Sequence, residues 1–288
     1  MFVYAPAKIN LTLEVLQKRD DGYHGIRSVM VPLELADTLQ IEPAEGFAFT
    51  CDDASLAGAD NLAARAALTL DPHLAAHIAL QKRVPVQAGL GGGSSDAAAV
   101  LRAAMRGGFG RSFAADWVAL ARSLGSDVPF FLVETGALVE GTGERVTAAG
   151  RLPHWHVLLV KPPDAVSTAA AYAQLDAHPR PIRPRSDSVS ITSLTALQRG
   201  DFDDVVRCLH NDFHDVIAQS TPGVARAIDA LRHAGARNAL LCGSGSAVFT
   251  LARDARTIAA IDERLALDAT FARFRTRFAT SELWRGAA

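Results

Sequence analysis

Alternation between apolar and polar positions dominates the first half of the chain and predicts β-strands. Apolar residues recur at every second position from Ile9 to Val15, so one face of this segment is apolar. Pro6 has no backbone N–H, and we expect it to interrupt the ladder so that Lys8 starts a second strand beside a bend. The strands predicted in this half are residues 2–5, 9–16, 26–35, 38–41, 47–51, 77–82, 137–140 and 145–147.

Helical patterns alternate with these strands. Asn61 is a capping residue type before an apolar run, so a helix is expected through Leu70. Residues 97–104 are mostly alanine, the best helix former. A link is expected at residues 109–113, and the remaining predicted helices are residues 115–124, 168–175, 193–198, 202–219, 223–234 and 256–267.

The second half of the chain begins after a boundary at residues 151–153. Strands predicted at residues 156–161, 238–241, 247–252 and 271–280, with helices between them, indicate a helix-backed antiparallel sheet. Residues 178–190 are rich in Pro and Arg and are expected to form a flexible surface connection. Its Arg180, Arg183 and Arg185 are expected to be solvated, although arginines could contact phosphate.

Composition adds limits to this picture. With 288 residues, 49% hydrophobic and 21% charged, the chain has the profile of a globular protein of one large or two medium domains. A formal charge of −2 gives no indication of nucleic-acid or membrane binding, and no stretch of about 18 apolar residues predicts a membrane span. The start of the chain lacks signal-peptide features and the three cysteines are scattered, so we expect a cytoplasmic protein with reduced thiols.

The stretch VPVQAGLGGGSSDA, residues 84–97, is the most informative segment. Its four glycines allow positive φ and close approach of the backbone to a ligand, and the Ser and Asp residues after them are helix-capping types. Exposed amides leading into a helix N-terminus favour an anion, and we infer the phosphates of a nucleotide. A tight strand-to-helix connection without a ligand is the alternative reading.

Two known phosphate motifs do not fit this stretch. A P-loop needs Lys directly after its last glycine, and this loop has none there. The dinucleotide fingerprint needs Gly or Ala where Ser94 stands and an acidic residue some 20 residues later, which argues against a dehydrogenase. Any catalytic lysine must therefore come from another part of the chain.

Two other segments offer charged groups for such a site. In a strand, Lys8 and Asn10 share a face, although a solvated lysine at a strand end is the simpler reading. Asp127 precedes Pro129 at an expected helix start, where it could be an N-cap, a carboxylate aimed into a cleft, or both. The turn at Asp21-Gly22 presents Tyr23 and His24, which are either surface residues or a grip for a planar base.

Five blocks in order resemble the GHMP kinases, a family of small-molecule ATP-dependent kinases. The blocks are PAKINL, RDDGYHGIRSVM, PVQAGLGGGSSDA, LGSDVPFF and LCGSGSAVF, and they span nearly the whole chain. The second and fourth blocks narrow the resemblance to a member that acts on a cytidine-bearing alcohol. Gln87 departs from the family pattern, which has a small residue there.

The resemblance implies an α+β, two-domain GHMP kinase fold. A ribosomal S5 domain 2-like N-terminal domain would comprise residues 1–152, and a ferredoxin-like C-terminal domain residues 153–288. It implies ATP and Mg²⁺ as cofactors and a small-molecule substrate as partner. The residues that it implies are Lys8 and Asp127 for catalysis; Pro85, Val86, Gln87, Ala88, Gly89, Leu90, Gly91, Gly92, Gly93, Ser94 and Ser95 for ATP; Asn10, Tyr23, His24, Thr168 and Tyr172 for substrate; and Ser95, ahead of Ser94, for the metal.

Two alternatives remain open at this stage. Another GHMP kinase could act on homoserine or a mevalonate-type alcohol, although neither substrate offers a base for the Tyr23-His24 turn. A nucleotide-binding regulator could keep the fold without catalysis, although it would need neither Lys8 nor Asp127. The sequence gives no indication of oligomeric state.

Overall fold

The computed structural model describes residues 1–109, 116–178, 181–182 and 184–285. Within these ranges the chain forms a seven-stranded and a four-stranded sheet, with strand orders β3-β4-β2-β1-β8 and β11-β7-β10-β9, and β5 pairs with both β2 and β6. Most of the predicted link at 109–113, the first residue of the helix predicted at 115–124, and Arg180 and Arg183 lie outside the described residues. The strands of the larger sheet are β1 Phe2–Lys18, β2 His24–Pro43, β3 Ala48–Cys51, β4 Ala76–Gln81, β5 Gly136–Gly141, β6 Arg145–Gly150 and β8 His210–Asn211.

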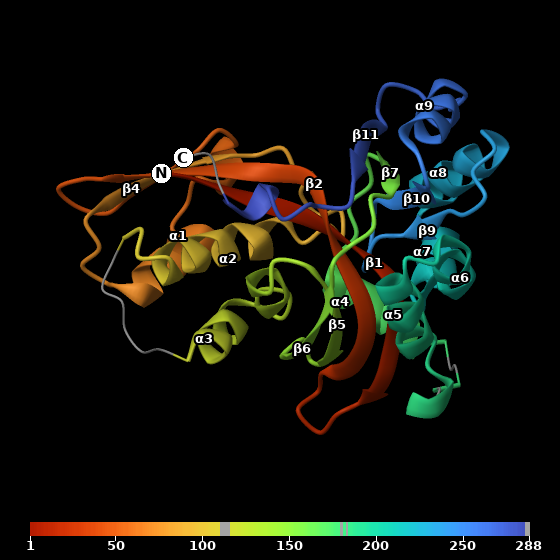
Figure 1. The fold of residues 1–288 in the computed structure, drawn as a ribbon, viewed down its shortest axis with the longest axis horizontal. Coiled ribbons are helices and arrows are strands. Elements are labelled where there is room, and N and C mark those ends of the chain that lie inside the picture. Colours follow the sequence, from red (N-terminus) through yellow and green to blue (C-terminus); the bar gives the residue numbers. More distant parts are fainter. Residues whose placement is uncertain (110–115, 179–180, 183, 286–288) are drawn as a thin grey trace.

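The two long strands β1 and β2 lie at the centre of the molecule and extend across it (Figure 1). The prediction that each would be two separate strands is wrong. The register shifts between Pro6 and Lys8, so the ladder passes the proline through an irregularity instead of ending there. Lys8 therefore lies in mid-strand.

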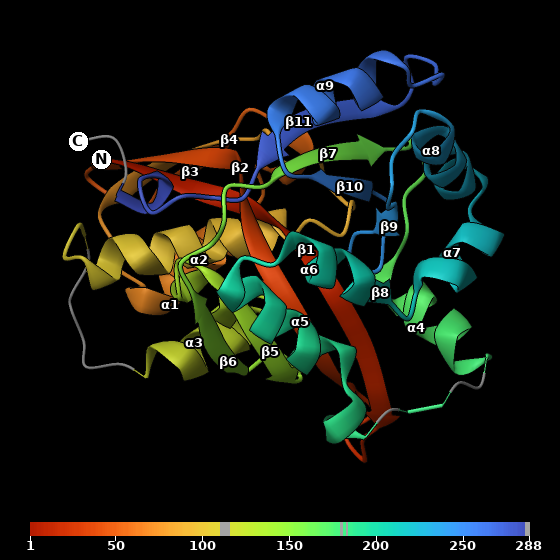
Figure 2. The ribbon, with the colours of Figure 1, turned by 45° about the vertical axis from the view of Figure 1, so that its right-hand side comes forward.

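The smaller sheet is antiparallel and carries helices, as the pattern of the second half predicted. Figure 2 shows helix α9 running along this sheet beside β11. Its strands are β7 His156–Lys161, β9 Leu240–Leu241, β10 Val248–Ala252 and β11 Ala272–Arg277. The helices of this half are α4 Thr168–Asp176, α5 Val189–Arg199, α6 Phe202–Cys208, α7 His214–Ser220, α8 Pro222–His233 and α9 Ala255–Glu263.

The first half has three helices, α1 (Leu62–Leu70), α2 (Gly92–Met105) and α3 (Trp117–Leu124); α2 packs against β1 and β2, and α1 and α3 pack against α2. Helix α1 starts as predicted, because Asn61 Oδ1 accepts the Ala63 N–H at 2.9 Å. Helix α2 starts earlier than predicted, at Gly92. Its N-cap residue is Gly91, and no side-chain hydrogen bond caps the helix. The Ser and Asp residues of the motif therefore lie inside its first turns.

The single helix predicted over residues 202–219 is interrupted. Helices α6 and α7 are separated by β8, which pairs in parallel with β1. The Asn211 amide donates to the carbonyl oxygens of Leu241 and Gly243 at 2.8 Å each, and its Oδ1 accepts the Phe213 N–H at 2.9 Å. These bonds need extended backbone at Asn211, which overrides the local helical pattern.

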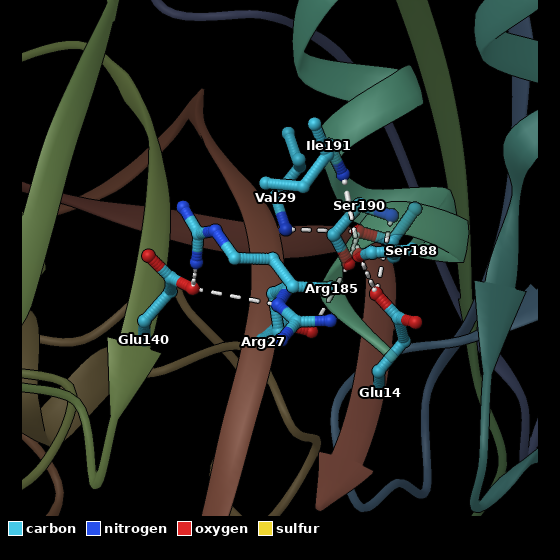
Figure 3. A network of polar contacts seen from close by, with 9 residues as sticks. Glu14, Arg27, Val29, Glu140, Arg185, Ser188, Ser190 and Ile191 are labelled. Carbon is cyan, nitrogen blue, oxygen red and sulfur yellow. Dashed lines mark hydrogen bonds and ion pairs between the residues drawn. The ribbon is translucent and has the colours of Figure 1, made fainter. Parts of the chain in front are cut away.

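The expectation of a flexible connection at residues 178–190 is wrong for its last residues (Figure 3). Ser188 Oγ and Ser190 N donate to Glu14 Oε2 at 2.5 and 3.2 Å. Arg185 pairs with Glu140, which also faces Arg27 Nε at 3.4 Å. This polar network fixes the start of α5 against β1, β2 and β5.

Arg102 on α2 ties together three segments that surround the glycine stretch. Its guanidinium is buried and donates to Phe131 O at 2.9 Å and Tyr4 O at 2.6 Å, and it stacks over Trp284 at 4.7 Å. Burial lowers the pKa of Arg102 to about 9, which still leaves it charged at pH 7. The 3₁₀ helix η2 (Pro129–Leu132), β1 and α2 are thus held at one point.

We expect Arg102→Met to lower the free energy of unfolding by about 2–4 kcal/mol, because the buried carbonyl of Phe131 and the partly buried carbonyl of Tyr4 lose their donor. The control is Arg207→Met, which removes an exposed ion pair with Asp204 and should cost at most about 1 kcal/mol. Urea denaturation of both variants checks this. Equal losses would contradict the structural role of Arg102.

Candidate active site

A cavity of about 870 Å³ is lined by residues from both halves of the chain. Most of the residues singled out in the sequence contribute to its wall. The lining includes Lys8, Asn10, Leu13, Ile26, Met30, Asn61, Lys82, residues 85–94, Asp96, Asp127, residues 165–168, Tyr172, Phe213 and residues 243–245.

The glycine loop presents its backbone to this cavity. Gly89 and Gly91 have φ of 74° and 71°, in the left-handed region that glycine tolerates, and Gln87 adopts 51° despite its side chain. Because no side chain caps α2, the first N–H groups of the helix remain available to a ligand. The loop therefore supplies the anion-binding geometry that the sequence predicts.

A second glycine loop, residues 242–246 between β9 and β10, packs directly against the first. The Ser246 N–H donates to Gln87 O at 3.4 Å and the Ala247 N–H to Ala88 O at 3.2 Å. A Cβ atom at Gly89 would lie 1.9 Å from Cys242 O, so this approach requires glycine. Each half of the chain thus holds the other half's loop in place.

Lys8 lies at the junction of the two loops. Its backbone N–H donates to Leu90 O at 2.9 Å, and its ammonium donates to Asn10 Oδ1 at 2.7 Å. Lys8 Nζ is 3.7 Å from Asp127 Oδ2, and Lys8 is only 4% exposed. An ammonium from β1 and a carboxylate from mid-chain therefore meet at the cavity, with Asn10 on the same face of β1 as predicted.

Asp127 is not an N-cap, which corrects one of its two expected roles. The cap position of η2 is Val128, and no side-chain hydrogen bond caps this helix. The Asp127 side chain is 29% exposed and lines the cavity. The carboxylate therefore faces Lys8 and the cavity and not the helix.

The structure does not support Ser95 as a contact for a metal or a phosphate. Ser95 is fully buried, is absent from the cavity wall, and its Oγ has no hydrogen-bond partner among the described residues. Ser94 does line the cavity. The helix starts at Gly92, and this register turns Ser95 toward the core and Ser94 toward the cavity.

The predicted substrate residues separate into two groups. Tyr172 and Thr168 line the cavity, and Thr168 Oγ1 lies 3.0 Å from Ser244 Oγ. The His24 ring stacks on Tyr172 with centroids 5.3 Å apart, while its nitrogens lie 2.9 Å from Leu16 O and from an oxygen of Asp176. Tyr23 is 67% exposed, and neither Tyr23 nor His24 belongs to the cavity wall.

The sequence pattern gives no sign of an ionic cluster beside the glycine loop, in which Lys82 contacts Asp37 and Asp96. Asp96 follows the two serines of the motif and was assigned to helix capping, so only the long-range pairing reveals its role. Apolar residues of the cavity wall (Leu13, Ile26 and Phe213) were likewise predicted only as parts of strands or of a helix. In the part of the chain described here, no group of three or more His, Cys, Asp or Glu side chains forms a metal site.

Matches to known proteins identify the family of this chain. The model of the GHMP kinases N terminal domain matches residues 61–135, and that of the GHMP kinases C terminal domain matches residues 193–267. A 4-diphosphocytidyl-2-C-methyl-D-erythritol kinase of Pelotomaculum thermopropionicum is 41% identical, over 93% of this chain and 96% of the relative. One of Deinococcus radiodurans is 39% identical, over 88% and 84%.

The chain belongs to the GHMP kinases, among the 4-diphosphocytidyl-2-C-methyl-D-erythritol kinases. A crystal structure of 4-(cytidine 5'-diphospho)-2C-methyl-D-erythritol kinase matches with a TM-score of 0.79 and 36% identity, covering 97% of this chain and all of that one. A homoserine kinase from Cytophaga hutchinsonii matches with a TM-score of 0.71 but 17% identity, which shows a shared fold alone. The predicted α+β GHMP kinase fold is therefore confirmed.

Because the two glycine loops are in contact, a single methyl group added at Gly89 should greatly lower the stability of the fold. Gly89→Ala should lower the free energy of unfolding by at least about 2 kcal/mol, because the new Cβ collides with backbone and φ is left-handed. Gly93→Ala is the control, since its Cβ would meet only Leu62 Cδ1 at 3.6 Å. Thermal melting of the two variants checks this, and a normal melting temperature for Gly89→Ala would contradict the contact.

Proposed function

We propose that this chain transfers the γ-phosphoryl group of ATP to the 2-hydroxyl of 4-diphosphocytidyl-2-C-methyl-D-erythritol, a step in non-mevalonate isoprenoid precursor biosynthesis. The names of its relatives support the reaction. The observation that carries it is the placement of Lys8 Nζ, 3.7 Å from Asp127 Oδ2, at the wall of a cavity that the glycine loop also lines.

The glycine loop binds and orients the nucleotide phosphates in this proposal. Phosphoryl transfer has a loose transition state with charge on the oxygen atoms, so positioning and electrostatics supply most of the catalysis. Loop amides and the free N-terminus of α2 stabilise negative charge on the leaving ADP. The second glycine loop keeps these amides in place before the nucleotide arrives.

Asp127 acts as the general base. As the bond forms between the substrate oxygen and the γ-phosphorus, the carboxylate accepts the hydroxyl proton and the bond to the ADP oxygen breaks. Lys8 offsets the negative charge of Asp127 and of the transferring group. Asn10 holds the ammonium in position through the 2.7 Å hydrogen bond.

The cytidine end of the substrate lies further along β1. Leu13 is five residues beyond Lys8, which corresponds to roughly 16 Å in a strand and leaves room for a diphosphate-linked alcohol. There Tyr172 and Phe213 offer aromatic surface, with rings edge to face at 4.9 Å. We assign base stacking to Tyr172 first, with Tyr23 and the backbone of His24 as further contacts.

The residues present fit a magnesium ion that arrives with ATP. Magnesium keeps several waters and needs few protein ligands, so the Ser94 hydroxyl at the cavity wall would suffice as a protein contact, and Asp127 keeps its role as the base. When bound, the ion neutralises charge on the phosphate oxygens.

No part of the described chain contains a helix that could cross a membrane, and we propose a cytoplasmic enzyme with a small-molecule substrate.

Asp127→Asn and Lys8→Met should each reduce kcat at least about 100-fold, because one removes the base and the other the adjacent positive charge. Nucleotide affinity should largely survive in Asp127→Asn. Steady-state kinetics and calorimetric titration with a non-hydrolysable ATP analogue check both statements. Near-normal turnover in the two purified variants would reject this pair as catalytic.

ATP consumption with the cytidylyl substrate, compared with homoserine and mevalonate, tests the substrate directly. We expect turnover with the first only, and Tyr172→Ala should raise its KM by about 5- to 150-fold through lost stacking, equivalent to about 1–3 kcal/mol. Preference for homoserine or mevalonate would support the alternative kinases. Binding of ATP without turnover of any of the three would favour a regulator.

A further inference from the structure

A buried serine completes a chain of hydrogen bonds that ends at the ammonium of Lys8. Lys8 Nζ donates to Asn10 Oδ1 at 2.7 Å, and Asn10 Nδ2 donates to Ser28 Oγ at 2.8 Å. Ser28 Oγ in turn donates to Thr12 O at 2.6 Å. Ser28 is fully buried and does not belong to the cavity wall, so any effect that it has on a ligand must pass through Asn10.

The pairing of β1 with β2 places Ser28 beside Asn10. Asn10 lies opposite Met30 in the ladder, and Ser28 is two residues from Met30, so both polar side chains lie on one face of the sheet. The register shifts between Asn10 and Thr12, an irregularity of the kind that re-aims side chains near functional sites. Asn10 is only 1% exposed, so solvent does not readily replace a lost partner.

The direction of each bond in this chain follows from the atoms involved. A carbonyl oxygen can only accept, so the single proton of the Ser28 hydroxyl points to Thr12 O. Ser28 Oγ then has only lone pairs left for Asn10, and a lone pair requires the amide NH2 group as its partner. The NH2 group of Asn10 therefore faces Ser28, and its oxygen faces Lys8.

The opposite orientation of the Asn10 amide is unfavourable at both ends. It would place the Asn10 oxygen against the lone pairs of Ser28, and the NH2 group against an ammonium that has three donors and no acceptor. Neither contact could be a hydrogen bond, and buried polar groups without partners cost free energy. In the observed orientation Asn10 holds one N–H of Lys8, whose Nζ lies 3.7 Å from Asp127 Oδ2.

We propose that Ser28 is a positioning residue that sets the orientation of the Asn10 amide and, through it, the position of the Lys8 ammonium beside Asp127. The inference rests on the proposed phosphoryl transfer, in which Lys8 offsets the charge of the base and of the transferring group. Because Ser28 does not belong to the cavity wall, its loss should affect turnover and leave the binding of both substrates nearly unchanged.

Steady-state kinetics of Ser28→Ala tests this role. The kcat should fall about three- to tenfold, the scale of one hydrogen bond, while the KM values for ATP and for the cytidylyl substrate change little. Ser193→Ala is the matched control, because Ser193 is also fully buried and its Oγ has no hydrogen-bond partner among the described residues. The control should keep the kcat of wild type.

A double-mutant cycle separates positioning from a general effect on the fold. Asn10→Ala removes the group through which Ser28 acts, so Ser28→Ala should lower kcat no further in that background. A merely structural role of Ser28 would lower kcat by the same factor in both backgrounds. Equal factors would therefore overturn the proposal.

NMR of the ligand-free protein tests the orientation of Asn10 without any turnover. The NH2 protons of Asn10 should show nuclear Overhauser effects to the β protons of Ser28, because Nδ2 lies 2.8 Å from Ser28 Oγ. Stronger effects to the ε protons of Lys8 than to Ser28 would show the reverse orientation and overturn the proposal.

The outcomes distinguish this inference from the proposed function. A Ser28→Ala variant with normal kcat, or Asn10 in the reverse orientation, would overturn the role of Ser28 and leave the kinase assignment intact. Absence of turnover by wild type with the cytidylyl substrate, homoserine and mevalonate would overturn both. A fall in kcat that disappears in the Asn10→Ala background, together with NMR contacts from Asn10 to Ser28, supports the proposal.

Discussion

Gly89 and Gly243 come from opposite halves of the chain, and their backbones touch. A Cβ atom at Gly89 would lie 1.9 Å from Cys242 O, and one at Gly243 would lie 3.0 Å from Gly89 O and 3.1 Å from Lys8 Nζ. Neither position can carry a side chain without moving the ammonium or a loop. The distance between the phosphate-binding amides and the charged pair is therefore set by two absent side chains together with the hydrogen bonds between the loops and the bond from the Lys8 N–H to Leu90 O.

Other parts of the fold position the two glycine loops against each other. Strand β1 delivers Lys8, and it also pairs with β8, whose Asn211 holds the second loop through Leu241 O and Gly243 O. Arg102 fixes α2 against β1 and η2, the segments next to Lys8 and Asp127. Because one strand serves both halves, the charged groups and the loops are preorganised before any ligand binds.

Local pattern predicted the parts of the site that depend on local chemistry. The glycine loop follows from the conformational freedom of its residues, and the shared face of Lys8 and Asn10 follows from strand periodicity. Predictions from the sequence pattern were wrong where contacts with residues from other elements determine the local structure. Asn211 breaks a helical pattern to reach the second glycine loop, and an early start of α2 turns Ser95 inward. Asp96, expected to cap a helix, instead pairs with Lys82, and Asp127 loses its expected role as an N-cap but lies beside Lys8 as the resemblance implied.

Hydrogen exchange at the second glycine loop, followed by NMR in the nucleotide-free protein, tests the central claim most directly. The amides of Ser246 and Ala247 donate to Gln87 O and Ala88 O, so the account predicts protection comparable with that of the strands of the smaller sheet. Exchange of these two amides at the rate of an exposed loop would show that the glycine loops do not hold each other, and would contradict a preformed site.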